Sequence, residues 1–201
     1  MDGIKNFFST VGSFIKENLS SLILILLAIF ALIVAIGLPG ATYSFAESEE
    51  VDANGEINLI SLMFGSGEII NRVEQTVTRQ AYSGGLSFVA LFSFVLLVAS
   101  VVLIILDFIF KGKNLKFYGS ICMVVSGIAV FFSLTLGTPF VVGNVELSFK
   151  EFWVTTNAPS DWHIGLACFL YAVPTIIGGG MVFFKELGKI LKAKGFGQKK
   201  Y

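Results

Sequence analysis

The sequence predicts an all-α membrane protein: a four-transmembrane-helix bundle with an N-terminal interfacial amphipathic helix and a small mixed α/β extracytoplasmic cap. Three observations lead to this prediction: four long stretches without charged residues, a one-sided distribution of lysine, and turn- and strand-forming sequence between the apolar stretches. The composition agrees, because 55% of the 201 residues are hydrophobic and 14% are charged. Soluble domains contain roughly 45–50% apolar and about 25% charged residues.

Each uncharged stretch contains about 20 mostly apolar residues, enough for a helix to cross a hydrocarbon core about 30 Å thick. In lipid, only helices and closed barrels satisfy every backbone polar group, and the stretches are continuously apolar rather than alternating, which favours helices. We expect the first span to be retained and not cleaved as a secretory signal, because it exceeds the usual length of about 7–15 apolar residues. The predicted spans lie near Leu22–Leu38, Leu86–Phe110, Phe117–Leu136 and Ile164–Phe184.

The lysines predict the orientation, because basic segments mark the cytoplasmic side of a membrane. Four spans place the first segment, the link between spans two and three, and the tail on one side. The only basic residues in the other two loops are Arg72, Arg79 and Lys150. We therefore expect a multi-pass protein of the plasma membrane with both termini in the cytoplasm, and the preference for lysine over arginine suggests a bacterial source. The basic segments hold Lys5, Lys16, Lys111, Lys113, Lys116, Lys185, Lys189, Lys192, Lys194, Lys199 and Lys200.

The chain divides into three parts on this prediction: residues 1–20, a four-helix transmembrane domain over 21–184 that includes outer loops 39–85 and 137–161, and a basic cytoplasmic tail over 185–201. The first part is amphipathic, which predicts a helix lying in the inner interface of the membrane. Packing against a soluble protein is the alternative. Its apolar residues recur at helical spacing: Ile4, Phe7, Phe8, Val11, Phe14, Ile15 and Leu19.

The outer loops contain sequence that predicts ordered structure. In the first loop we expect strands over Thr42–Phe45 and Glu56–Phe64, separated by a turn at Asn54-Gly55. A helix over Gly67–Tyr82 should follow. Ser66 would cap that helix and Glu68 would pair with Arg72 four residues on. The second loop carries a strand-like run over Phe140–Phe149, and Trp162 near its end suits the headgroup level.

The sequence offers no catalytic, cofactor-binding or metal-binding residues. It contains no phosphate loop, no Cys-x-x-Cys and no nucleophile elbow. His163 is the single histidine, and the acidic residues of the first loop lack the spacing of a calcium loop. Asp107 should pair with Lys111 or extend its side chain to the inner membrane interface. A role in an ion path is the alternative. We therefore expect a protein that is not an enzyme.

Small residues recur four apart within the spans, as in Ala31 with Ala35 and Cys122 with Ser126. Such residues let helices approach closely, so we expect packing within the bundle. Contact with another chain, or a flexible point near Pro174 and the three glycines that follow it, is the alternative. Cys122 and Cys168 should lie at different depths, too far apart for a disulfide.

Four spans, cytoplasmic ends and a long, strand-bearing first outer loop resemble the topology of claudins and the peripheral myelin protein group. The resemblance is limited to topology, because this loop lacks the Trp, the Gly-Leu-Trp and the two cysteines of claudins. The sequence thus predicts a non-enzymatic subunit or scaffold of a membrane assembly, with homo-oligomers included. A small oligomeric channel or transporter subunit is the alternative. The expected partners are other membrane protein chains and anionic lipids at the lysine-rich tail, not nucleic acid.

Overall fold

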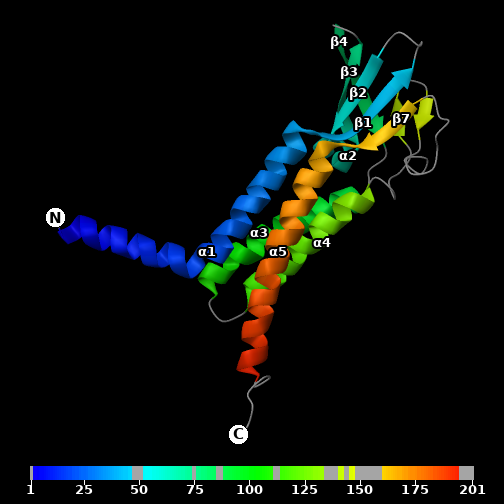
Figure 1. Cartoon of the computed structure of the whole chain (residues 1–201). Helices are drawn as coiled ribbons and strands as arrows, with labels where there is room; N and C mark the ends of the chain where they lie inside the picture. The colour runs from blue at the N-terminus through cyan, green and yellow to red at the C-terminus, as the bar shows by residue number, and fades with distance from the viewer. Residues whose placement is uncertain are drawn as a thin grey trace.

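The computed structural model describes residues 2–46, 52–73, 76–84, 88–110, 114–133, 140–142, 145–147 and 160–194. This part of the chain is mostly helical. Its long helices are α1 (Asp2–Gly37), α3 (Phe88–Ile109), α4 (Leu115–Ser133) and α5 (Leu166–Ala193). Each contains a segment long and apolar enough to cross a membrane, so the four predicted apolar helices are confirmed as candidate spans within the described residues. Figure 1 shows these helices side by side, with a β-sheet at one end of the bundle.

The helices pack through a regular pattern of buried residues. In α3 the buried positions alternate in steps of three and four, and α1 follows the same pattern. This spacing is typical of helices that pack at a shallow angle, with small residues allowing close approach. The buried residues of the two helices are Ala90, Ser93, Leu97, Ser100 and Ile104 in α3, and, among the described side chains, Ser21, Leu24, Ala28, Ala31, Val34 and Ala35 in α1.

Within the described residues, the sheet has seven antiparallel strands in the order β6-β5-β4-β3-β2-β1-β7. The first loop supplies the four central strands and α2 (Leu59–Phe64), whereas the second loop supplies strands at both edges. β7 pairs with β1 and leads into α5, so the sheet joins both loops into one unit. The strands are β1 (Pro39–Ala46), β2 (Asp52–Asn58), β3 (Ser66–Val73), β4 (Thr76–Gly84), β5 (Phe140–Val142), β6 (Val145–Leu147) and β7 (Ser160–Ile164).

Several predictions for the first loop are wrong in detail. The predicted helix over Gly67–Tyr82 is the hairpin of β3 and β4. Glu68 therefore meets Arg79 on the neighbouring strand, at 3.3 Å between Oε2 and Nη1, instead of Arg72 along a helix. The physical reason is that Ile, Val, Thr and Tyr in this segment fit a pleated surface, and β2 offers β3 a partner strand.

The turn predicted at Asn54-Gly55 is also wrong, because both residues lie within β2 and pair with β1. Residues 59–64, predicted as strand, form α2, which ends at Gly65 in the left-handed conformation (φ 67°). The predicted strand over Thr42–Phe45 is confirmed within β1. The run over Phe140–Phe149 contains β5 and β6, and its remaining residues lie outside the described part.

The N-terminal segment and the first span form one continuous helix, α1. In Figure 1 the first half of α1 leaves the bundle at a wide angle, at the end opposite the sheet. The last turns of α5 extend beyond the bundle at the same end. Both described ends of the chain therefore lie at the end of the bundle that is remote from the sheet.

Candidate functional site

Three helices bring buried hydroxyl groups together in the middle of the bundle. Ser126 Oγ of α4 donates to the Ser93 carbonyl of α3 at 2.8 Å, and Ser93 Oγ donates to the Ser126 carbonyl at 2.9 Å. The Tyr171 hydroxyl of α5 is hydrogen-bonded to Ser126 Oγ at 2.8 Å and lies 3.4 Å from Ser93 Oγ. All three residues are fully buried. This hydroxyl cluster (Ser93, Ser126 and Tyr171) links three helices.

The hydrogen bonds of the hydroxyl cluster connect the helices and serve a structural role. Serine and tyrosine hydroxyls stay neutral near pH 7, and here each finds its partner within the cluster or on a helix backbone. Interhelical bonds of this kind stabilise membrane helices modestly, by about 0.6–2 kcal/mol each. In the sequence, Ser126 stands out only as a small residue, and neither Ser93 nor Tyr171 stands out. The recurrence of Ser93 and Ser100 seven residues apart in an apolar span is the signal that could have revealed this face.

Glycines bring α5 into close contact with α4 and with α1. A Cβ atom on Gly179 would lie 2.9 Å from Val124 Cγ2, and one on Gly127 would collide with Thr175 Oγ1. A Cβ atom on Gly178 would collide with Leu27 of α1, whereas Gly180 faces open space. Two of the three glycines after Pro174 thus serve packing inside the bundle, as expected for small residues in membrane helices.

A second set of contacts fixes the sheet to the bundle. The backbone N–H of Gly165 donates to the Gly40 carbonyl at 2.8 Å, and Cys168 Sγ donates to the same carbonyl at 3.3 Å. A Cβ atom on Gly40 would lie 2.6 Å from Leu59 Cα, so β1 and α2 touch at backbone distance. We call Gly40, Leu59, Gly165 and Cys168 the joint, because they connect α2, β1 and α5.

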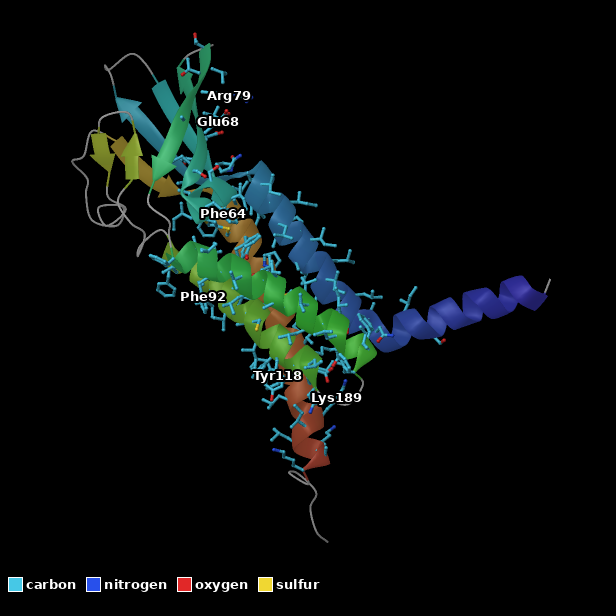
Figure 2. The ribbon with its side chains drawn as sticks, turned by 180° about the vertical axis from the view of Figure 1, so that it is seen from behind. Phe64, Glu68, Arg79, Phe92, Tyr118 and Lys189 are labelled. Carbon is cyan, nitrogen blue, oxygen red and sulfur yellow. The ribbon has the colours of Figure 1, made fainter. Side chains whose placement is uncertain are left out.

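α2 completes the attachment of the sheet. Leu59, Leu62 and Met63 are buried, and the Phe64 ring meets Phe94 of α3 edge-to-face at 5.4 Å between centroids. Asn58 Nδ2 donates to the Ile36 carbonyl at the end of α1, at 3.1 Å. Figure 2 shows Phe64 where the sheet meets the helices. The sheet is therefore held to α1, α3 and α5.

Asp107 lies at the opposite end of the bundle and caps a helix. Its Oδ1 accepts a hydrogen bond at 3.1 Å from the backbone N–H of Lys116, in the first turn of α4. The Lys116 ammonium donates to Ser20 Oγ of α1 at 3.4 Å. Helix N-termini carry unpaired N–H groups and attract carboxylates, which explains an acid at the end of a span. Lys111 lies outside the described residues, so its pairing with Asp107 stays a prediction.

Replacing Asp107 by alanine is expected to lower the stability of the folded protein by about 1 kcal/mol, the usual loss for a helix cap. Asp107→Asn keeps an oxygen acceptor for the Lys116 N–H and should lose less than half as much. Thermal unfolding of the purified protein in mild detergent measures both values. Equal losses in the two variants would show that Asp107 acts through its charge and not as a cap.

Among the described residues, those considered for metal binding or chemistry are not brought together. Within the described ranges, no group of three or more His, Cys, Asp or Glu residues could hold a metal ion. The acidic residues at positions 47, 49 and 50 lie outside the described residues. His163 lies in β7, opposite Thr42 of β1. Both cysteines are free thiols, Cys168 in the joint and Cys122 half-buried in α4.

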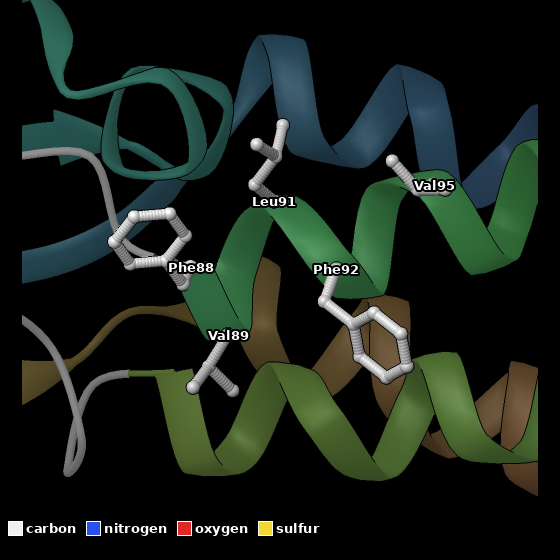
Figure 3. Close-up of a pocket in the computed structure, with 5 residues that line it drawn as sticks. All are labelled: Phe88, Val89, Leu91, Phe92 and Val95. Atoms are coloured by element: carbon white, nitrogen blue, oxygen red, sulfur yellow. The ribbon is translucent and has the colours of Figure 1, made fainter.

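A groove opens on the surface of α3 at the end nearest the sheet. It has a volume of about 500 Å³ and is lined by Phe88, Val89, Leu91, Phe92 and Val95. Figure 3 shows these side chains along two turns of α3. The lining side chains are hydrocarbon throughout and belong to the surface of a candidate span, so the groove offers no group for catalysis and suits contact with acyl chains.

No protein-family model matches the chain, and no curated protein matches its sequence.

Proposed function

We propose that this chain, a four-span membrane protein, is a non-enzymatic subunit or scaffold of a membrane assembly, which includes assemblies of its own copies. The observation that carries the proposal is the seven-stranded sheet, which draws strands from both loops and is fixed to the helices through the joint and α2. Long loops are usually either functional or disordered, and the described parts of these two loops contribute strands to one paired sheet. A sheet attached at several points presents a rigid surface to another protein.

The hairpin of β3 and β4 offers an exposed part of that surface. Glu68, Val77, Arg79 and Ala81 are exposed on one face, and the Val77 side chain is 58% exposed. Figure 2 shows Glu68 and Arg79 on strands that extend away from the helices. A contact at this face would bury Val77 with the charged Glu68 and Arg79 at its edge, which is the apolar centre and polar rim of a protein interface.

Replacing Val77 by lysine is expected to weaken the assembly at least about tenfold, because an apolar contact would be replaced by a charge. Thr78→Lys, in the same strand but on the opposite face, is the matched control and should have no effect. Native mass spectrometry after gentle detergent extraction measures the copies and partners retained. A chain that is extracted as a lone monomer, with Val77→Lys indistinguishable from wild type, would contradict the proposal.

A channel or transporter subunit is the alternative, and one observation favours it. The buried polar residues of the bundle include Ser21 and Ser100, whose hydroxyls lack a hydrogen-bond partner within the described structure. Against this alternative, Leu97, Met123 and Tyr171 fill the space between α3, α4 and α5. Solute or ion flux into liposomes that depends on Ser100 and not on the sheet would favour the alternative.

We also propose the orientation that the lysines indicate, with the sheet outside the plasma membrane and both termini in the cytoplasm. The position of both described ends remote from the sheet supports it. The amphipathic first half of α1 is proposed to lie in the inner interface, and its wide angle to the bundle is what such a helix requires.

Single cysteines tested with an impermeant thiol reagent on intact cells check this orientation. Glu49→Cys and Lys150→Cys should be labelled, whereas Lys113→Cys and Lys194→Cys should be labelled only after the cells are opened. The unmodified protein is the control, because its two cysteines lie in candidate spans. Labelling of Lys113→Cys on intact cells would overturn the four-span orientation.

A further inference from the structure

We propose that Lys116 and Ser20 form a latch that sets the angle between the first half of α1 and the bundle, and that this half of the helix swings when the latch opens. The latch is the contact between the two side chains, at the end of the bundle remote from the sheet. Its role is separate from the assembly contacts proposed for the sheet.

α1 bends where it reaches the bundle. The helix is continuous from Asp2 to Gly37 and contains no proline, yet its first half leaves the bundle at a wide angle in Figure 1. In this half Gly12, Ser13 and Ile15 are exposed. Because the first half extends away from the other helices, we attribute its angle to contacts made at the bend itself.

Lys116 of α4 makes a contact at this level. Its Nζ atom donates a hydrogen bond to Ser20 Oγ at 3.4 Å, one residue before the fully buried Ser21. The backbone N–H of Lys116 donates to Asp107 Oδ1 of α3 at 3.1 Å. The base of the Lys116 side chain is therefore fixed by α3 and α4, and its tip holds α1.

The contact is weak enough to open. The Ser20 hydroxyl is a neutral acceptor, and its distance from the ammonium is longer than the usual range of about 2.7–3.2 Å for an N–H···O bond. A hydrogen bond of modest strength changes an equilibrium about fivefold, which biases the angle of the helix without locking it. From Ser21 onward, buried residues in steps of three and four hold the second half of α1 in the bundle. Opening of the latch therefore moves the first half alone.

The distance between two spin labels measures the angle of the first half. Gly12→Cys and Gly180→Cys carry the labels, because an added Cβ atom at either position has no atom within 4 Å. Gly180 lies in the part of α5 that packs in the bundle and serves as the fixed reference. Gly12 lies about 12 Å along α1 from Ser20, so a swing at the bend changes the distance between the labels.

The full-length protein in mild detergent is used, with Cys122→Ala and Cys168→Ser removing the native thiols. Cys168→Ser keeps a donor for the Gly40 carbonyl. Thermal unfolding checks that every labelled variant remains folded.

We expect Lys116→Met and Ser20→Ala to shift the label distances in the same way, raising the population away from the wild-type distance about fivefold. Combining the two substitutions should add nothing, because both remove one contact. Lys116→Arg keeps a charged donor and should retain the wild-type distances. Ser21→Ala is the matched control. It makes the same change one residue later, at a hydroxyl without a hydrogen-bond partner within the described structure, and should leave the distances unchanged.

Three outcomes would overturn the proposal. Wild-type distances in both Lys116→Met and Ser20→Ala would show that the contact does not set the angle. A shift in Lys116→Met without one in Ser20→Ala would assign the angle to the charge of Lys116. An equal shift in Ser21→Ala and Ser20→Ala would assign it to the local stiffness of the helix. None of these outcomes depends on whether the sheet binds another chain.

Discussion

Gly40→Ala is expected to destabilise the protein by at least about 3 kcal/mol, at the upper end of the losses caused by overpacking. The added Cβ would lie 2.6 Å from Leu59 Cα and 2.9 Å from Leu59 N. Both are backbone atoms, so no rotation of a side chain can relieve the contact. β1 or α2 must then move, and the hydrogen bonds from Gly165 and Cys168 to the Gly40 carbonyl weaken with it.

Thermal unfolding in mild detergent should show a decrease of roughly 6–12 °C in Tm for Gly40→Ala. Gly165→Ala should act in the same direction, because its Cβ would collide with the Pro39 carbonyl. Gly180→Ala is the control. It has no atom within 4 Å of its added Cβ and should be neutral or stabilising by up to about 1 kcal/mol in a helix. A wild-type Tm for Gly40→Ala would mean that the joint does not hold the sheet as described.

Tyr171→Ala is expected to cost about 3–5 kcal/mol, as truncation of a large buried ring usually does. The side chain is fully buried where α3, α4 and α5 meet, so its removal leaves a cavity and also leaves the Ser126 hydroxyl without its tyrosine partner. Tyr171→Phe separates these two effects. It keeps the ring and should cost only about 1 kcal/mol, the usual contribution of one hydrogen bond.

A pair of serine variants tests whether the hydrogen bonds of the hydroxyl cluster stabilise the bundle. Ser126→Ala should cost about 1 kcal/mol and should couple to Tyr171→Phe in a double-mutant cycle. Ser100→Ala is the control, because Ser100 is equally buried on the same face of α3 as Ser93 but its hydroxyl has no hydrogen-bond partner within the described structure. Its removal should be neutral or slightly stabilising. Similar losses of stability for Ser100→Ala and Ser126→Ala would show that the hydrogen bonds of the hydroxyl cluster do not stabilise the bundle.

The sequence by itself determined the four helices, because the length and apolar composition that a membrane span requires are properties of one continuous segment. About 20 apolar residues without charge need no distant partner to specify a candidate span. The strand over Thr42–Phe45 was also predictable from its own residues. The hydrophobic spans, the lysine asymmetry and the small residues four apart are all properties of neighbouring positions along the chain.

The tertiary structure alone decided the hairpin, the joint and the hydroxyl cluster. The segment after Ser66 carries a helix-capping residue and a charge pair at helical spacing, yet β2 and β4 offer it strand partners, and sheet pairing outweighs the local preference. Ser93 and Tyr171 are 78 residues apart in the chain, and Gly40 and Cys168 are 128 apart. The seven-residue spacing of Ser93 and Ser100 marks a face of α3 but not its partners, because each contact at such separation depends on how whole helices and strands meet. Asp107 is likewise an isolated charge in the sequence. It is recognised as the cap of α4 only when the fold brings its carboxylate to the Lys116 N–H.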